Sequence, residues 1–179
     1  LYNFLISLII PFALLRHMFK ASFFGEKKLR AFEKIGFFQG EKNLNKSIWI
    51  HAVSVGEVNV ALKLIQDLEE ILESPNFILS TTTLTGARKA QENHSKNLKH
   101  VYFPFDLKFI CKKFISFYNP SIILLVETEI WPNLINVSKE FKLPVVLVNG
   151  RLSDKSLKKY QRLSSFFKDS FNKIDHAFV

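Results

Sequence analysis

Two acidic segments of this chain follow apolar stretches that are typical of buried β-strands. Glu127 and Glu129 come directly after the apolar residues 122–126, and Glu57 ends the stretch 51–57. In open parallel α/β sheets, ligands bind at the carboxyl ends of the strands. A strand does not need acids at its tip, and burying an unpaired carboxylate is costly. We therefore interpret these residues as candidates for acid/base chemistry.

Ser54, Gly56 and Glu57 are expected to form the turn between the first strand and the next helix. Gly56 would allow the backbone to turn tightly, and the start of the helix would offer free N–H groups to an anion. The helix dipole also favours an acid in the first helical turn. The position of Glu57 is thus compatible both with a general base and with a purely structural role.

A hydroxyl-rich turn, residues 81–86, is expected after the second strand. Thr83, Thr85 and Gly86 are candidates for contacts with phosphate or sugar hydroxyl groups. The turn lacks the glycine and lysine pattern of nucleotide-binding loops. Thr85 is also expected to cap the helix that begins at Gly86, which is the simpler explanation of its type.

Two other strand ends carry polar residues. Asp106 follows the third strand, where capping of the following helix is its simplest role. Arg151 lies in the loop after the fifth strand and would either bind a carboxylate or phosphate or remain solvated. His51 lies inside the first strand and is expected to be a core residue. Trp49 and Trp131 are expected in the core or in a pocket wall.

Composition limits the possible partners. The chain has 179 residues, of which 47% are hydrophobic, and a formal net charge of +9, so we expect a globular domain whose partner is a nucleic acid, an anionic membrane or a phosphorylated substrate. No arginine-rich run or zinc-ligand spacing supports nucleic acid. The single cysteine, Cys111, excludes an internal disulfide and a cysteine-built metal site. His94 and His100 lack metal-ligand spacing, so no metal is expected.

Residues 1–20 are expected to form a membrane anchor or an interfacial helix. The apolar part ends at Leu15, which is short of the about 20 residues that a spanning helix needs, and basic residues follow from Arg16 onward. This basic flank predicts that the rest of the chain is cytoplasmic. A surface helix packed on the domain is the alternative. Because the chain starts at Leu and stops within an apolar strand, we expect it to be a piece of a longer protein.

Residues 21–46 are expected to be a basic linker with one short helix. From residue 47 to residue 179, strands and helices alternate, which predicts a Rossmann-like, doubly wound parallel α/β sheet. Ser153 is expected to cap the last helix. The expected strands are 47–53, 76–82, 100–103, 122–126, 144–148 and 176–179, and the expected helices are 56–73, 86–93, one ending at 118, 132–141 and 154–172.

Five of these segments, in this order, resemble the N-terminal half of the 3-deoxy-D-manno-octulosonic acid (Kdo) transferases of Gram-negative bacteria. Each segment alone is a weak signal, but the five together, with the tryptophan-containing one intact, are specific. The apolar N-terminus followed by basic residues is similar too. The segments are 51–57, 81–86, 104–106, 127–133 and 149–153.

The resemblance implies a GT-B glycosyltransferase of lipopolysaccharide biosynthesis, with two Rossmann-like domains and the active site between them. It implies transfer of Kdo from CMP-Kdo to the lipid A precursor (lipid IVA), with inversion, at the cytoplasmic face of the inner membrane, and without metal or other cofactor. The N-terminal domain would bind the acceptor. Donor-binding residues would lie beyond Val179, so this chain alone is expected to be inactive.

The resemblance also implies roles for single residues. Glu57 matches the general base that deprotonates the acceptor hydroxyl, and Glu127 matches a residue that stabilises the transition state. A carboxylate suits a cation-like sugar transition state. The basic surplus suits a phosphorylated acceptor and anionic lipid. The candidates for substrate contacts are Ser54, Gly56, Thr83, Thr85, Gly86 and Glu129, with Arg88, Lys89 and Arg151 for acceptor phosphates.

Two other functions remain open from the sequence. One is a non-catalytic, membrane-tethered binding domain built on a flavodoxin-like sheet. The other is a different two-domain glycosyltransferase that acts on another lipid or on a polysaccharide. The sequence that follows Val179, and above all a donor pocket, would separate these functions from Kdo transfer.

Overall fold

In the computed structural model, residues 2–23, 25, 27–39, 46–93, 95–151 and 164–179 are described. Their strands form one sheet in which all neighbouring strands are parallel. The predicted α/β class with a parallel sheet is therefore confirmed. The six strands are β1 (Ile48–His51), β2 (Phe77–Thr81), β3 (Leu98–Tyr102), β4 (Ile122–Val126), β5 (Val145–Val148) and β6 (His176–Ala177).

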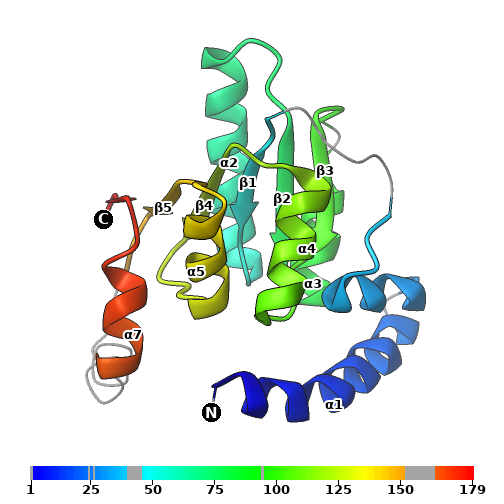
Figure 1. The fold of residues 1–179 in the computed structure, drawn as a ribbon. Coiled ribbons are helices and arrows are strands. Elements are labelled where there is room, and N and C mark those ends of the chain that lie inside the picture. The colour runs from blue at the N-terminus through cyan, green and yellow to red at the C-terminus, as the bar shows by residue number, and fades with distance from the viewer. Residues whose placement is uncertain (1, 24, 26, 40–45, 94, 152–163) are drawn as a thin grey trace.

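Helices cover both faces of the sheet. In Figure 1, α4 and α5 lie in front of the strands and α2 and α3 lie behind them. A 3-10 helix, η1, and the long helix α1 lie at the β3 side and the lower edge of the sheet. The helices are α1 (Tyr2–Phe23), η1 (Lys28–Ile35), α2 (Val55–Ile71), α3 (Leu84–Gln91), α4 (Lys108–Tyr118), α5 (Pro132–Glu140) and α7 (Ser164–Phe171).

The two faces of the sheet bury separate apolar clusters. Successive side chains of a strand point to opposite faces, so Trp49 of β1 packs with α4 and α5, whereas Ile50 packs with α2 and α3. Because both faces are covered, β4 and β5 are apolar at every position and β1 at three of its four positions, instead of alternating with polar residues. Trp49 is fully buried, and its ring stacks on Phe114 of α4 at 4.2 Å between centroids.

The strand order is β3-β2-β1-β4-β5-β6. This is the strand order of dinucleotide-binding (Rossmann) sheets, and it differs from the flavodoxin order, in which the third strand lies beside the first. The alternative of a flavodoxin-like sheet is therefore wrong. The chain reverses its winding direction between β1 and β4, and ligands of open α/β sheets bind at such a switch point.

Helix α1 lies along the carboxyl edge of the sheet (Figure 1), and contacts near both of its ends hold it there. Near the start, the Tyr2 hydroxyl donates to Asp106 at 2.6 Å, and the Asn133 side chain donates to Asn3 at 2.7 Å. Near the end, the ring of His17 packs edge-on against Tyr102 at 4.6 Å. The helix is thus part of the folded domain along its length.

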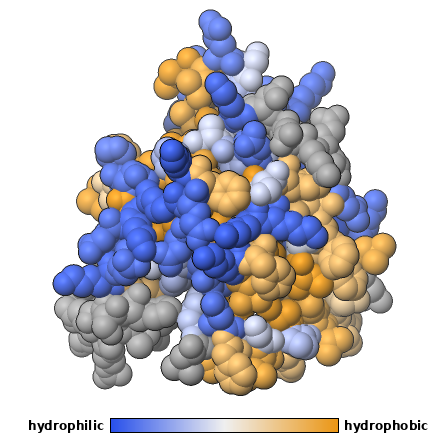
Figure 2. Space-filling view, in the orientation of Figure 1, coloured by the Kyte–Doolittle hydropathy of each residue, from blue (hydrophilic) through white to orange (hydrophobic). Residues whose placement is uncertain are grey.

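The outer face of α1 is apolar. Figure 2 shows hydrophobic surface gathered over this part of the molecule. Within the described residues, α1 is the one helix long and apolar enough to cross a membrane, a test that rests on length and composition only. The exposed side chains of this face, the apolar face of α1, are Phe4, Leu5, Leu8, Ile9, Phe12, Leu15, Phe19 and Phe23.

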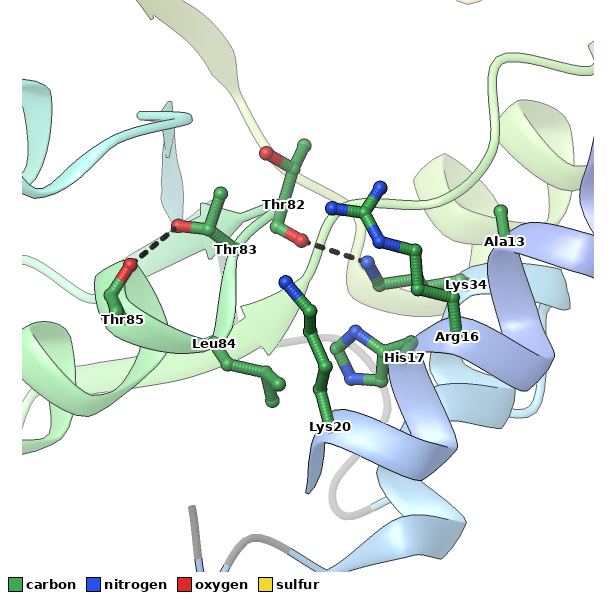
Figure 3. Close-up of a pocket in the computed structure, with 9 residues that line it drawn as sticks. All are labelled: Ala13, Arg16, His17, Lys20, Lys34, Thr82, Thr83, Leu84 and Thr85. Atoms are coloured by element: carbon green, nitrogen blue, oxygen red, sulfur yellow. Dashed lines mark hydrogen bonds between the residues drawn. The ribbon is translucent and has the colours of Figure 1, made fainter. Parts of the chain in front are cut away.

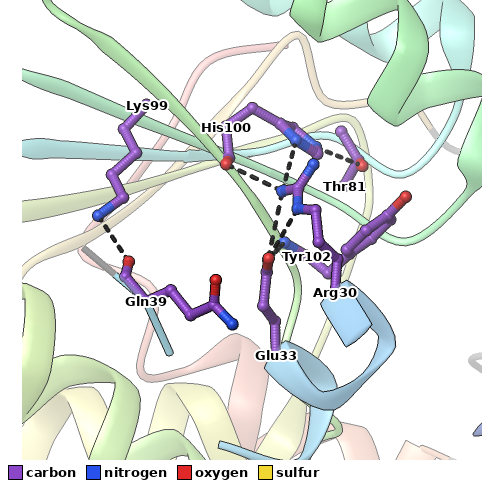
Figure 4. Close-up of polar contacts among 7 residues, drawn as sticks. All are labelled: Arg30, Glu33, Gln39, Thr81, Lys99, His100 and Tyr102. Carbon is purple, nitrogen blue, oxygen red and sulfur yellow. Dashed lines mark hydrogen bonds and ion pairs between the residues drawn. The ribbon is translucent and has the colours of Figure 1, made fainter. Parts of the chain in front are cut away.

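Helix η1, which lies in the segment expected to be a linker, packs on the edge strand β3. The Glu33 carboxylate accepts a hydrogen bond from the Tyr102 backbone N–H at 2.8 Å and from Arg30 at 2.7 Å. Arg30 also donates to the His100 carbonyl at 3.1 Å, as Figure 4 shows. Because an uncovered edge strand invites pairing with other chains, these contacts protect this side of the sheet.

Two expected helix caps are corrected by the structure. Thr83, not Thr85, caps α3, because its side chain accepts from the Gly86 N–H at 3.1 Å. Asp106 does not cap the following helix α4, whose cap position is Leu107 without a side-chain bond. The expected helix 154–172 is described only from Ser164, and its expected cap Ser153 lies outside the described residues.

Asp106 instead joins three elements. Its buried carboxylate accepts from the backbone N–H groups of Leu134 at 2.7 Å and Asn133 at 3.0 Å, at the start of α5, and from Tyr2 of α1. The first N–H groups of a helix have no partner within the helix, so Asp106 supplies a cap from a distant part of the chain. The carboxylate thereby connects α1, the end of β3 and α5.

We expect Asp106→Ala to lower the free energy of unfolding by about 2 kcal/mol, because it leaves one buried and one partly buried N–H group without an acceptor. Chemical denaturation measures this directly. The matched control is Asp67→Ala, which removes an exposed i,i+4 pair with Lys63 and should change stability by less than about 0.5 kcal/mol. Equal effects of the two variants would contradict the capping role of Asp106.

Candidate functional site

The switch point brings two of the sequence-predicted acids to one edge of the sheet. β1 and β4 are parallel neighbours, with His51 paired in register with Leu125. Glu57 lies in the first turn of α2 after β1, and Glu127 follows β4 directly. Two acids that are 70 positions apart in the sequence therefore lie at the carboxyl ends of adjacent strands.

The Glu57 carboxylate takes part in a capping box at the start of α2. One of its oxygens accepts from the Val53 N–H at 2.7 Å and the other from the Ser54 N–H at 3.1 Å, while Ser54 accepts from the Glu57 N–H. The structural role considered for Glu57, stabilisation of the start of a helix, is thus present. A carboxylate has about four lone-pair sites, so these bonds fix its orientation and leave capacity for one further donor. Glu57 is buried, with 5% of its surface exposed.

Glu127 has a backbone conformation that is unfavourable for its residue type. Its φ is +58°, in the left-handed region, and its N–H donates to the Val148 carbonyl at 2.9 Å. Asn149 occupies the same region at the end of β5, with φ +53°. Asn tolerates this region far better than Glu does. The fold therefore keeps a carboxylate where an amide or glycine would cost less.

An apolar cavity of about 360 Å³ lies between α1 and the carboxyl edge of the sheet. Its walls come from α1, from η1, from the ends of β1, β2 and β3, and from the loop after β4, so it adjoins the switch point. Glu129 and Asp106 supply its carboxylates. The residues that line this apolar cavity are Ile6, Ile9, Lys34, Val53, Thr82, Phe103, Pro104, Phe105, Asp106, Glu129 and Trp131.

A second, cationic cavity of about 330 Å³ also lies against α1, and the two cavities share Lys34 and Thr82. Figure 3 shows the basic side chains of Arg16, Lys20 and Lys34 directed toward the hydroxyl-rich turn after β2. The residues that line this cationic cavity are Ala13, Arg16, His17, Lys20, Lys34, Thr82, Thr83, Leu84 and Thr85.

Burial changes the ionisation of two residues near these cavities. Desolvation lowers the pKa of Lys34 to about 8, although the neighbouring Glu33 acts in the opposite direction. Desolvation also lowers the pKa of His51 to about 3, although a hydrogen bond to the backbone carbonyl of Ser80 acts in the opposite direction. His51 is therefore neutral, fully buried and stacked on Phe103 at 3.8 Å, which confirms the prediction that it is a core residue.

The other predicted substrate residues do not all meet. Thr83 and Thr85 line the cationic cavity, and Glu129 lines the apolar one. Arg88 is exposed on α3, and Lys89 forms an ion pair with Glu92 at 2.9 Å. Arg151 and these two side chains line neither of the described cavities.

The two glycines differ in what the structure requires of them. At Gly86, an added Cβ would lie 2.9 Å from the Thr83 hydroxyl and 3.4 Å from the Val53 carbonyl, so the close approach of α3 to β1 needs a glycine. Gly56 has no left-handed φ, and a Cβ there would meet only Ser54 at 3.8 Å. The expectation that the backbone turn requires a glycine at position 56 is therefore wrong.

Sequence reasoning did not assign Arg16, Lys20 and Lys34 to a site. The signal was present in α1, where Arg16 and Lys20 are four positions apart and so lie on one side of a helix. They had been interpreted only as a basic flank of an apolar segment. Lys34 carried no such signal, because its burial depends on how η1 packs against α1.

Across the described ranges, no group of three or more His, Cys, Asp or Glu side chains is placed to hold a metal ion. The polar groups at the carboxyl edge are instead carboxylates, hydroxyls and three basic side chains. These groups can accept a proton from a hydroxyl, bind sugar hydroxyl groups and bind an anion.

The strand order and the polar strand ends define an α/β protein of the Rossmann type with its ligand edge at the switch point. A family model described as 3-deoxy-D-manno-octulosonic-acid transferase (Kdo transferase) matches residues 29–179. The chain therefore belongs to this family. The resemblance identified from five short segments is confirmed.

Relatives with known names agree with this assignment. The chain is 39% identical over 129 residues to a bifunctional glycosyltransferase/methyltransferase of Fusobacterium nucleatum, which covers 71% of this chain and 20% of the relative. It is 33% identical over 129 residues to the 3-deoxy-D-manno-octulosonic acid transferase of Haemophilus influenzae. That match covers 72% of this chain and 30% of the relative. The chain is 35% identical over 131 residues to the enzyme of the same name from Rickettsia typhi, and the match covers 71% of this chain and 28% of that enzyme. The chain spans less than a third of the length of these three relatives.

We expect Glu127→Asn to raise the free energy of unfolding by about 0.5 kcal/mol, because Asn tolerates the left-handed backbone better than Glu. The same exchange at Glu129, whose φ is not positive, is the control and should bring no gain. Thermal and denaturant unfolding measure both effects. A clear loss of stability in Glu127→Asn would mean that the Glu127 side chain stabilises the fold.

Proposed function

We propose that this chain is the acceptor-binding part of a GT-B Kdo transferase of lipopolysaccharide biosynthesis. The reaction is transfer of Kdo from CMP-Kdo to the lipid A precursor, lipid IVA, with inversion at the anomeric carbon and without a metal or other cofactor. The donor would be held by a second Rossmann-like domain, as in two-domain glycosyltransferases. The observation that carries the proposal is the position of Glu57 and Glu127 at adjacent strand ends in a member of this family.

Glu57 is proposed as the general base. Its carboxylate accepts two backbone N–H groups, which hold it at the edge where an acceptor would bind. A remaining lone pair would take the proton of the acceptor hydroxyl as its oxygen attacks the anomeric carbon and the CMP phosphate leaves with the bonding electrons. A positioned base of this kind contributes about 10²–10⁴ to the rate.

Glu127 is proposed to stabilise the transition state. Positive charge develops on the sugar ring as the bond to CMP breaks, and a fixed carboxylate nearby lowers the energy of that state. The left-handed conformation of Glu127 supports this assignment, because backbone strain of this kind is concentrated at functional sites. The presence of a glutamate at position 127, despite its unfavourable backbone conformation, would then serve the reaction.

The proposed location is the cytoplasmic face of the inner membrane, with α1 in contact with the lipid. Hydrogen bonds tie the start of α1 to Asp106 and Asn133, and the His17 ring near its end packs on Tyr102. These contacts favour an α1 that lies in the plane of the membrane surface, with its apolar face inserted. The carboxyl edge of the sheet would then lie directly beneath the headgroups, where a lipid acceptor is found.

The transfer assay uses the chain together with any sequence that flanks it in its gene, with CMP-Kdo and lipid IVA as substrates. We expect Glu57→Gln to lower kcat by about 10²–10⁴. Glu70→Gln is the matched control, because it makes the same exchange at an exposed position of the same helix, and its kcat should be unchanged. Retention of full activity in folded Glu57→Gln would exclude Glu57 as the base.

A second candidate function is transfer of a different sugar. The name of the Fusobacterium nucleatum relative specifies a glycosyltransferase without naming Kdo, and that relative shows 39% identity to the chain. The same assay with other nucleotide-activated sugars as donors separates the two functions. Turnover with another donor but not with CMP-Kdo would exclude the Kdo assignment and leave the proposed roles of Glu57 and Glu127 to be tested in that reaction.

We expect spin labels at Leu8→Cys and Phe19→Cys to lie at the same depth in the bilayer, about 5–10 Å below the headgroups. These positions are separated by 11 residues, or about 16 Å along the helix, so a spanning α1 would place them at clearly different depths. Collision with oxygen and with a nickel chelate, measured by electron paramagnetic resonance, gives both depths. Buried Cys111 should not react with the label.

A further inference from the structure

The cationic cavity lies at the same edge of the sheet as the proposed catalytic acids, but neither acid lines it and it has no part in the chemistry derived for them. Its basic groups come from two elements that the sequence analysis left outside the site, Arg16 and Lys20 from α1 and Lys34 from η1. The turn after β2 forms the opposite wall. The cavity therefore exists only when α1 and η1 are docked on the sheet.

In the part of the chain that the structure describes, the basic residues of this cavity form no ion pairs. The acid next to Lys34, Glu33, already accepts from Arg30 and from the Tyr102 N–H. Three cations around one cavity of about 330 Å³ repel one another, and a multiply charged anion would relieve that repulsion.

The opposite wall supplies hydrogen-bond donors suited to oxygen atoms. Thr82, Thr83 and Thr85 line it with hydroxyl groups, and Leu84 and Thr85 form the first turn of α3. N–H groups in the first turn of a helix lack partners within the helix and attract anions. Lys34 uses one donor on the Thr82 carbonyl at 2.8 Å and has two left, because an ammonium group carries three.

His17 provides an independent observation at the same cavity. It lines the cavity, it is more than nine-tenths buried, and its Nε2 has no hydrogen-bond partner within the described residues. A buried polar group without a partner is costly and calls for an explanation. A bound anion or a water molecule that accompanies it would supply the missing partner.

The position of the cavity on α1 indicates where its ligand comes from. Phe12, Arg16 and Lys20 follow one another at four-residue spacing, so the two basic residues border the apolar face of α1. Phe12 and Phe19 on that face are 72% and 69% exposed. If this face is inserted in the membrane, Arg16 and Lys20 lie at the level of the lipid headgroups, where basic side chains bind lipid phosphates.

We propose that the cationic cavity binds a phosphomonoester group carried by a lipid at the membrane surface. A phosphomonoester offers two negative charges and three acceptor oxygens, which matches three cations and the surrounding hydroxyl and amide donors better than a carboxylate does. The proposal rests on the proposed function for one point, that this lipid is the acceptor. The neighbouring apolar cavity, which shares Lys34 and Thr82, would take a less polar part of the same molecule.

The test measures binding to vesicles and requires no turnover. One set of phosphatidylcholine vesicles carries phosphatidic acid, a phosphomonoester lipid, and the other carries phosphatidylserine at equal net charge. We expect tighter binding to phosphatidic acid, and we expect Arg16→Gln and Lys20→Gln each to reduce that preference by about tenfold. Both side chains are exposed, so the variants should fold, which thermal unfolding checks.

Lys63→Gln is the matched control, because Lys63 is an exposed lysine of α2 whose partner is Asp67. It should leave the preference for phosphatidic acid intact. Equal binding to both kinds of vesicle, weakened equally by all three variants, would overturn the proposal, since only general charge attraction would then be present. Inorganic phosphate is titrated in parallel. If binding of inorganic phosphate depends on Arg16 and Lys20 but both kinds of vesicle bind equally, the proposal that the phosphate group is carried by a lipid is overturned.

Failure of this proposal can be told apart from failure of the proposed function. Loss of phosphate preference in a protein that still transfers Kdo counts against the cavity alone. Conversely, a phosphate preference that depends on Arg16 and Lys20, in a protein without transferase activity, would refute the assignment of the lipid as acceptor and leave the anion site in place.

Discussion

Strand β1 pairs with β2 on one side and with β4 on the other, and the arrangement of the site depends on this pairing. It reverses the winding of the sheet at β1, so the turns after β1 and β4 open at the same edge without a helix between them. Glu57, the turn after β2 and Glu127 all project from this edge. A sheet in flavodoxin order would place the third strand beside β1 and separate these groups.

The helices that cover that edge, α1 and η1, are the second determinant of the site. Asp106 ties α1 and α5 to the end of β3, and η1 holds the edge strand through Glu33. Because α1 lies along the edge, its inner side forms walls of two cavities and its outer side carries exposed apolar residues. The exposed apolar surface and the walls of both cavities thus belong to one helix, which would link the proposed membrane location to the proposed binding of the acceptor.

Most of the sheet could be predicted from the sequence because its strands are short and largely apolar, with polar residues or Pro close to their ends. The run 122–126 matches β4 without a shift. Long-range contacts could not be predicted in the same way. Asp106 looked like a local cap and instead caps a helix 26 positions further along, and Thr83 replaced Thr85 as a cap by a shift of two residues. The basic side chains of the cationic cavity depend on how α1 docks, which no local pattern encodes.

We propose that the carboxyl edge beneath α1 receives the lipid acceptor. Hydrogen–deuterium exchange of the protein, with and without lipid IVA in the same detergent, tests this claim most directly. We expect slower exchange in residues 51–57 and 82–86 and in α1 when the lipid is present. Slower exchange confined to the opposite edge of the sheet, at residues 72–76, 119–121 and 142–144, with no change in α1, would contradict it.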